Sequence, residues 1–197
     1  MLIIGYALCY LTDMTQEDSG ITMTEKMINI RPSRWEDLKQ FYEWELQENV
    51  KQFFSIRDGQ TFEEVVRTYV ASDEDPAQEQ FTIELDGVMI GRIVLADIIK
   101  GWKGELLRIY IGDAGNRGAG YGRQAMEWVM DHCFRELSLQ RLYLDYYTGN
   151  PAQFLYEKLG FQHEGMLRKN CRKNGVLYDV HLMSMLAEEY AARRGVQ

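Results

Sequence analysis

The chain has 197 residues, of which 46% are hydrophobic and 26% are charged. This size and composition fit one globular domain with one core. The 30 acidic residues outnumber the 22 lysines and arginines and give a net charge of -8. An acidic chain without a basic stripe excludes the classes of protein that bind nucleic acid through phosphate contacts. We therefore expect a small or cationic partner and no nucleic acid.

The cysteines Cys9, Cys133 and Cys171 are odd in number and show no C-x-x-C spacing. This pattern indicates reduced thiols in a cytoplasmic protein. The three histidines are scattered, so we predict no metal site. The apolar first ten residues lack the basic segment of a signal peptide and are too short to span a bilayer as a helix. We expect no membrane contact.

Regular patterns begin only after Met27. We expect residues 1–26 to form a flexible N-terminal extension, residues 27–190 a single domain, and residues 191–197 a C-terminal tail. The alternation over residues 28–31 predicts a short strand that stops at Pro32.

Two helices should follow that strand. Ser33 as N-cap, with Glu36 three residues on, predicts a helix start. Apolar residues from Trp35 to Leu46 recur at helical spacing, and we expect this stripe to face the core. Thr61 and Glu64 form the same capping pattern for a second helix over residues 62–70.

The second half of the chain alternates strands and helices. Asp86-Gly87 lies between two alternating runs, 81–85 and 88–95, and predicts a hairpin with a tight turn. Further elements are expected as strands over 104–112 and 142–146, helices over 123–137 and 152–159, and a closing hairpin over 165–186. The sequence thus predicts a three-layer domain of the α/β (α+β) class.

A glycine-rich turn, Asn116 to Gly122, lies between the strand over 104–112 and the helix that follows it. Unpaired backbone N–H groups and the helix dipole favour an anion there, and Arg117 adds a permanent positive charge. A dinucleotide-binding turn needs G-x-G-x-x-G, whereas the spacing here is G-x-G-x-G, and a Walker A loop needs a Lys-Ser or Lys-Thr that is absent. A connection without a ligand is the remaining alternative.

The turn has the pattern R-x-x-G-x-G, and Leu155 to Phe161 reads L-Y-E-K-L-G-F. These two motifs, in this order and at this separation, resemble the GNAT superfamily of N-acetyltransferases over about residues 28–186. Residues 164–168 and 174–179 resemble the branch that includes ribosomal-protein and spermidine acetyltransferases.

This resemblance implies a central mixed, mostly antiparallel twisted sheet flanked by helices, with two strands that separate to admit acetyl-coenzyme A. By the same resemblance, Ile109, Tyr110 and Ile111 offer backbone groups to the pantetheine, and Asn150 lies near that arm. Asn150 before Pro151 would also suit a turn without a ligand. The residues implied for the pyrophosphate are Arg117, Gly118, Ala119, Gly120, Tyr121, Gly122 and Arg123.

The resemblance also implies that Tyr156 is a general acid which protonates the leaving thiolate. An aromatic wedge between helix and sheet is the alternative for this residue. Glu105 is a candidate general base, a solvated strand end is its alternative, and an ordered water could serve instead.

We expect an acceptor that is a small amine, a protein N-terminus or a lysine. Carboxylates on the first helices suggest an acidic rim for a cationic acceptor: Glu36, Glu43, Glu45, Glu48, Glu63 and Glu64. The rival hypothesis is a non-catalytic sensor of acetyl-coenzyme A, and the oligomeric state is expected to be monomer or homodimer.

Overall fold

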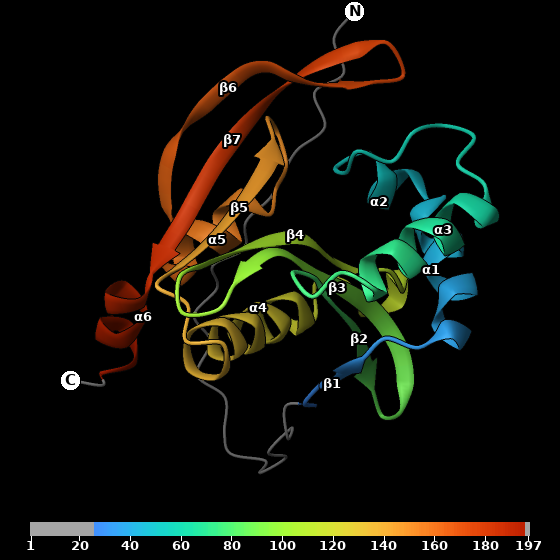
Figure 1. Ribbon diagram of the computed structural model, residues 1–197. Coiled ribbons are helices and arrows are strands. Elements are labelled where there is room, and N and C mark those ends of the chain that lie inside the picture. The colour runs from blue at the N-terminus through green and yellow to red at the C-terminus, as the bar shows by residue number, and fades with distance from the viewer. Residues whose placement is uncertain (1–25, 196–197) are drawn as a thin grey trace, which may run out of the picture.

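The computed structural model describes residues 26–195 (Figure 1). A seven-stranded sheet has the order β1-β2-β3-β4-β5-β7-β6, and every neighbouring pair is antiparallel except β4 and β5. The strands are β1 (Asn29–Pro32), β2 (Glu79–Leu85), β3 (Val88–Ile99), β4 (Lys103–Ile111), β5 (Arg141–Tyr147), β6 (Gln162–Lys173) and β7 (Val176–Leu186). The helices are α1 (Leu38–Glu45), α2 (Glu48–Lys51), α3 (Phe62–Asp73), α4 (Tyr121–Asp131), α5 (Gln153–Leu159) and α6 (Ala187–Arg194).

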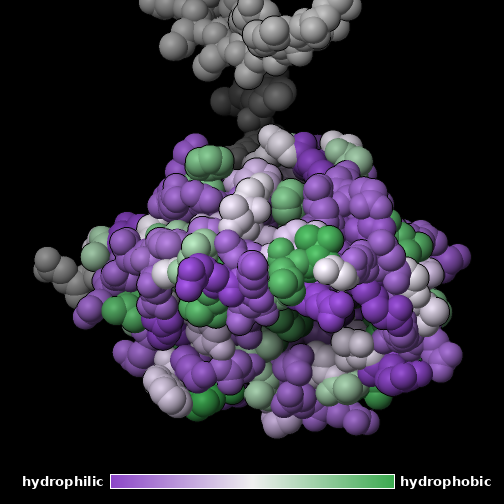
Figure 2. All heavy atoms as spheres, turned by 90° about the horizontal axis from the view of Figure 1, so that it is seen from above, coloured by the Kyte–Doolittle hydropathy of each residue, from purple (hydrophilic) through white to green (hydrophobic). Residues whose placement is uncertain are grey.

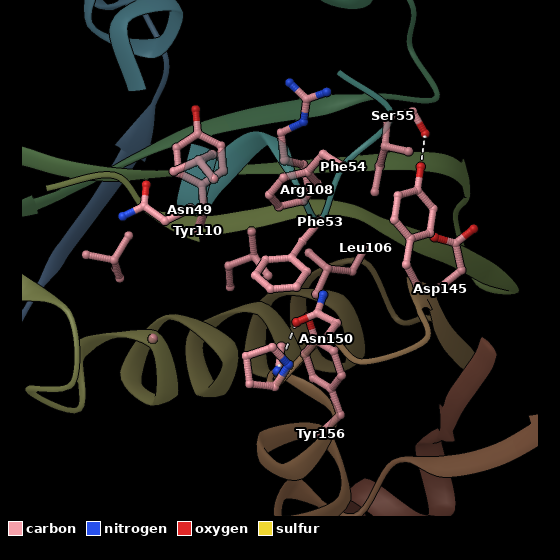
Figure 3. Close-up of a pocket in the computed structure, with 18 of the residues that line it drawn as sticks. Asn49, Phe53, Phe54, Ser55, Leu106, Arg108, Tyr110, Asp145, Asn150 and Tyr156 are labelled. Atoms are coloured by element: carbon pink, nitrogen blue, oxygen red, sulfur yellow. Dashed lines mark hydrogen bonds between the residues drawn. The ribbon is translucent and has the colours of Figure 1, made fainter. Parts of the chain in front are cut away.

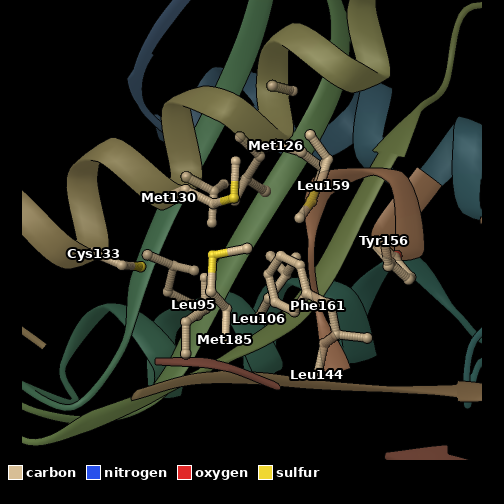
Figure 4. Packing of buried hydrophobic residues seen from close by; sticks show 14 of the residues in the cluster. Leu95, Leu106, Met126, Met130, Cys133, Leu144, Tyr156, Leu159, Phe161 and Met185 are labelled. Carbon is tan, nitrogen blue, oxygen red and sulfur yellow. The ribbon is translucent and has the colours of Figure 1, made fainter. Parts of the chain in front are cut away.

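Helices cover both faces of the sheet, which confirms the predicted three-layer class. The larger core lies between the sheet and the side chains of α4 and α5, around Leu95, Met126 and Leu144 (Figure 4). A smaller cluster joins α1, α2 and α3 to Tyr110 on the opposite face. The face of the molecule seen from above in Figure 1 is mostly hydrophilic, with a few hydrophobic side chains near its centre (Figure 2).

The predicted hairpins are confirmed. Asp86 and Gly87 have φ angles of 52° and 79°, as a tight turn between β2 and β3 requires. Asn174 and Gly175 have φ angles of 48° and 81° and form the turn between β6 and β7. The closing hairpin extends well beyond the rest of the sheet (Figure 1).

The first helix begins differently from the prediction. A 3₁₀ turn, Trp35–Asp37, precedes α1, and its N-cap is Arg34 rather than the predicted Ser33. The Asp37 carboxylate, rather than that of Glu36, accepts the backbone N–H of this N-cap residue at 2.9 Å. Trp35 and Leu46, which the helical spacing assigned to the core, are 56% and 47% exposed. The second predicted helix is α3, and it starts where the sequence predicted, after the N-cap Thr61.

The reciprocal cap of α3 joins Thr61 and Glu64 through hydrogen bonds of 3.3 and 2.8 Å. The helix continues to Asp73, where the acidic segment before Pro76 ends it. The helix expected over 123–137 starts two residues earlier and finishes with a π-helical turn, His132–Glu136.

The sequence did not predict α6, although it lies partly in the expected tail. Tyr190 is buried and stacks on Phe134 with ring centroids 4.9 Å apart. The carboxylate of Glu189 accepts the N–H of Leu186 and begins the helix. The expected N-terminal extension lies outside the described residues, except for Lys26.

A β-bulge in β4 changes the face of the sheet to which the side chains of the strand point. Leu95 of β3 pairs with Leu106, but Val94 pairs with Arg108, so Leu107 is the extra residue. Before the bulge, Leu106 points into the larger core. After it, Arg108 and Tyr110 point toward α1 instead, because the bulge shifts the alternation by one residue.

Strands β4 and β5 are joined by only three residue pairs. Lys103, Gly104 and Glu105 pair with residues 141–143, and the two strands separate beyond Glu105. The separation that the resemblance implied is therefore present. It leaves the β5 side of residues 106–111 without a partner strand.

A buried carboxylate connects α1 to the sheet near this separation. Oε1 of Glu45 accepts hydrogen bonds from Arg92 at 2.9 Å, from Arg108 at 2.6 Å and from the Tyr110 O–H at 3.1 Å. Burial opposes the ionisation of Glu45, but the two arginine charges and the Tyr110 hydrogen bond outweigh it and hold its pKa below the ordinary value. Glu45 thus fixes the α1 layer against β3 and β4.

We expect Glu45→Gln to destabilise the domain by about 3 kcal/mol at pH 7, because two partly buried guanidinium groups lose their counter-charge. The measurement is urea unfolding, with Glu43→Gln on the exposed face of α1 as the matched control. Because the folded-state pKa of Glu45 is lowered, its contribution is complete above the ordinary value of 4.5 and is lost as pH falls through the folded-state pKa. The difference between wild type and variant should therefore shrink in acid, and a constant difference would contradict this assignment.

Candidate active site

A pocket of about 590 Å³ lies where β4 and β5 separate (Figure 3). Its walls are formed by residues 106–111 of β4, the end of β5, the start of α5, and the segment Asn49 to Ser55. Gly118 and Gly122 of the glycine-rich turn lie at one end, and Asp145 and Tyr147 of β5 also line it. The pocket therefore brings together parts of the chain that are more than 120 residues apart.

One wall is an open strand edge. Backbone groups of β4 beyond Glu105 have no β5 partner, and Ile109, Tyr110 and Ile111 line the pocket. An unpaired edge can accept an extended ligand in the manner of an added strand. The structure thus places these three residues where the sequence predicted.

The glycine-rich turn forms the end of the pocket nearest α4. Gly118 and Gly120 have φ angles of 78° and 87°, which favour glycine. A Cβ built on either glycine would meet no other atom within 4 Å, so the space above the turn is open. Within the described chain, no acceptor meets the N–H groups of Tyr121 and Gly122 at the start of α4. These donors and the helix dipole suit a phosphate.

Arg117 holds the turn in place as well as lining the pocket. Its Nε donates to the carbonyl of Ile111 at 2.8 Å, and its Nη2 donates to Gly112 O at 2.6 Å and to Gln47 Oε1 at 2.9 Å. The sequence predicted a fork of donors directed at a pyrophosphate. Nε and Nη2 of Arg117 instead donate to the protein itself, and the terminal nitrogen that can still donate to a ligand is Nη1.

Three other predicted residues of the turn do not line the pocket with their side chains. Tyr121 is buried in the larger core, Ala119 is exposed, and Arg123 pairs with Glu127 at 3.0 Å. Of these three side chains, Arg123 is the one that leaves a charge exposed beside the turn.

Asn150 lies in the turn after β5 and lines the pocket. Its Oδ1 accepts the N–H of Ala152 at 3.0 Å and so helps to begin α5 (Figure 3). The turn-forming role considered from the sequence is therefore real, and the side-chain NH₂ is not used by that contact.

Tyr156 projects from α5 and forms part of both the core and the pocket wall. It is 7% exposed, and its ring lies 6.2 Å from Tyr146 and 6.1 Å from Phe161. Burial, and after it the charge of Asp145, raises the pKa of the Tyr156 phenol. The phenol is therefore protonated at neutral pH and can donate a proton.

Glu105 lies on β4 just before the strands separate and does not line the pocket. Burial, then the charges of Asp145 and Asp97, raise its pKa. The carboxylate that does line the pocket is Asp145, which the sequence analysis did not select. An acidic residue within the apolar run Leu142 to Tyr146 was the available signal.

The Tyr147 hydroxyl, on the same strand as Asp145, is a second polar group of the pocket that was not predicted from the sequence. The Tyr147 hydroxyl lies 2.8 Å from Ser55 Oγ and 3.0 Å from Cys171 Sγ, and all three residues line the pocket. This contact joins β5 to the segment after α2 and to β6. Tyr147 falls just beyond the predicted strand, so no periodicity pointed to it.

The expected acidic rim does not surround the pocket. None of its six carboxylates is among the lining residues, and most have other partners. Glu45 is buried with Arg92 and Arg108, while Glu63 and Glu64 pair with Arg67 and Arg57. Three of the six carboxylates are therefore paired with arginines and do not line the pocket.

Two further features of the described residues bear on the class of protein. Within residues 26–195, no three His, Cys, Asp or Glu side chains lie close enough together to hold a metal ion. None of the helices in this part of the chain has the length and apolar character needed to cross a membrane.

The fold and pocket together define a class: an acyltransferase domain with separated central strands, an open strand edge and a glycine-rich helix start. Residues 28–162 match the family described as "Acetyltransferase (GNAT) domain". The chain belongs to this family of acetyltransferases, as the two motifs predicted.

The similar proteins point to one branch of that family. The chain is 27% identical to a spermidine N(1)-acetyltransferase of Escherichia coli K12 over 166 aligned residues. The aligned region covers 84% of this chain and 89% of that protein. The chain is 28% identical over 159 residues to the spermidine N(1)-acetyltransferase of Vibrio cholerae, with coverage of 80% and 91%. The Vibrio cholerae spermidine N-acetyltransferase in complex with CoA and spermine aligns with a TM-score of 0.75 and 27% identity, over 83% of this chain and 98% of that one. The expected relationship to spermidine acetyltransferases is confirmed.

Proposed function

We propose that the chain transfers the acetyl group of acetyl-coenzyme A to a primary amine by direct attack of the amine on the thioester. The observation that carries this proposal is the single pocket that joins the phosphate-binding turn, the open β4 edge and the Tyr156 phenol. The family indicates the reaction class, and the residues that line the pocket support the roles proposed below.

We assign the proposed cofactor contacts to the glycine-rich turn, the open β4 edge and Asn150. The N–H groups at Gly118 to Gly122 and the start of α4 bind the pyrophosphate, with the remaining donors of Arg117 and the charge of Arg123 nearby. Backbone groups of residues 109–111 pair with the pantetheine, and the Asn150 amide donates to the same arm. The open space above Gly118 and Gly120 leaves room for the phosphates.

Tyr156 acts as the general acid. Acetyl-coenzyme A supplies an activated acyl group whose thiolate leaves when an amine attacks. The raised pKa of Tyr156 keeps its O–H available at neutral pH, and the phenol protonates the thiolate as the C–S bond breaks. The aromatic packing considered from the sequence is compatible with this role, because it holds the ring in one position.

A polyamine is the acceptor that we propose first. The relatives that act on spermidine span most of this chain, and a similar structure contains spermine. In the described part of the chain, Asp145 is the residue that contributes a carboxylate to the lining of the pocket. Its negative charge favours a cationic amine.

Thermal-shift titration with acetyl-coenzyme A, coenzyme A and NAD, followed by a free-thiol assay with polyamines, tests the proposal. Stabilisation by the first two ligands that grows with their concentration, together with amine-dependent thiol release, is expected. Stabilisation without thiol release from any amine would favour the sensor that the sequence left as the alternative.

We expect Gly120→Val to weaken coenzyme A binding at least ten-fold, measured by calorimetry. The branched side chain enters the phosphate space, and the left-handed backbone costs about 1–2 kcal/mol of stability. Gly101→Val is the matched control, because Gly101 has a φ of 75° and an equally open Cβ position in the turn between β3 and β4. Equal binding by both variants would contradict the phosphate assignment.

We expect Tyr156→Phe to lower kcat about ten-fold or more while coenzyme A affinity changes by no more than a few-fold. The ring still packs, but no proton is supplied to the thiolate. Tyr146→Phe removes a hydroxyl from the neighbouring core tyrosine and should leave kcat within about two-fold. Unchanged turnover in Tyr156→Phe would rule out the acid role.

A further inference from the structure

Of the charged residues that line the pocket in the described part of the chain, two have partners within the protein and one does not. Arg108 is paired with Glu45, and Arg117 is bonded to backbone carbonyls and Gln47. Asp145 is the third charged residue that lines the pocket, and in the described part of the chain no cation or hydrogen-bond donor meets its carboxylate. The pocket therefore contains one negative charge that is available to a ligand.

Asp145 lies where β4 and β5 begin to separate. It follows the last paired residue, Tyr143, by two positions and so points to the same face of the sheet. Leu144 and Tyr146 on either side of it point into the larger core. Asp145 and Tyr147, two positions apart on β5, both line the pocket, and Asp145 is labelled on its wall in Figure 3.

The surroundings of Asp145 make its charge influential. Asp145 is an exposed residue, but the protein atoms around its carboxylate desolvate the charged form enough to raise its pKa above the ordinary value. Its charge contributes to the raised pKa values of Glu105, Tyr147 and Tyr156, although burial is the largest cause for each. The titratable and charged groups on the surrounding elements are Glu105, Arg108 and Tyr110 on β4, Arg117 in the glycine-rich turn, Tyr147 on β5, Tyr156 on α5 and Cys171 on β6. Asp145 and the proposed acid Tyr156 line the same pocket, and the charge of Asp145 acts on the Tyr156 phenol.

We propose that Asp145 is the residue that binds the ammonium group of the acceptor and removes its proton. This inference rests on the proposed function. It gives Asp145 the role for which Glu105 was the candidate, because Asp145 lines the pocket with Tyr156 and Glu105 does not.

The proton balance is simple. The acceptor enters as R–NH₃⁺, and the Asp145 carboxylate takes one proton to leave R–NH₂. The nitrogen lone pair forms the C–N bond, the C–S bond breaks, and Tyr156 gives its proton to the thiolate. The amide nitrogen loses its second excess proton, one proton restores Tyr156 and the other leaves to solvent. The net change is R–NH₃⁺ and thioester to amide, thiol and one H⁺.

The test is the steady-state kinetics of Asp145→Asn with spermidine and acetyl-coenzyme A, compared with wild type. The variant keeps the size of the side chain but loses its charge and its basicity. We expect kcat/KM for spermidine to fall about 100-fold or more, the usual scale of a general base, while the thermal shift caused by coenzyme A is unchanged.

The pH profile separates this role from a structural one. Wild-type kcat/KM should fall as pH decreases through the pKa of Asp145, which lies above its ordinary value of 3.8, because the protonated acid can neither attract nor deprotonate the amine. Asp145→Asn should lack this acidic limb. Asp145→Glu should restore part of the activity and the limb.

Asp97→Asn is the matched control. Asp97 is a carboxylate on β3 outside the pocket, paired with Lys103 and bonded to Tyr143, and its φ of 49° is one that Asn tolerates. It should retain wild-type kinetics. Asp145→Asn with wild-type kcat/KM and an unchanged acidic limb would overturn the inference, and a loss confined to Glu105→Gln would return the role to Glu105. Absence of amine-dependent thiol release from the wild type would instead overturn the proposed function itself.

Discussion

The short contact between β4 and β5 is the constraint on which the rest of the molecule depends. Three parallel pairs hold the two strands together, and beyond Glu105 they separate while the sheet continues on both sides. A longer contact would close the pocket and cover the β4 edge. A shorter one would leave the two halves of the sheet joined mainly by helices. The pocket, its open edge and its end at α4 all follow from where this pairing stops.

The bulge at Leu107 and the buried Glu45 keep that arrangement fixed. The bulge turns Arg108 and Tyr110 toward α1, where both donate to Glu45. An uncompensated carboxylate in this position would be costly, so the network favours one placement of α1 against the sheet. Because the segment after α1 forms a wall of the pocket, the same network also holds that wall in place.

The sequence predicted the parts of the fold that depend on local pattern. The Asp86-Gly87 hairpin, the cap of α3 and the turn before α4 were predicted because their residues determine backbone angles directly. The role of Asp37 at the start of the first helix, the burial of Glu45 and the helix after β7 were not, because each depends on a distant partner such as Thr82, Arg92 or Phe134. In the site, the motifs predicted residues 109–111, Gly118, Gly122 and Tyr156, all of which line the pocket. Asp145 was missed because only the separation of the strands places it in a pocket.

Hydrogen exchange with and without acetyl-coenzyme A tests the central claim most directly, namely that the ligand lies in the gap between β4 and β5. We predict slower exchange for backbone amides in two segments, residues 107–111 along the open edge and residues 118–122 at the start of α4, because the ligand supplies acceptors to amides such as those of Tyr121 and Gly122 that have none in the described chain. Unchanged exchange in both segments at saturating ligand, or protection confined to another surface, would contradict it.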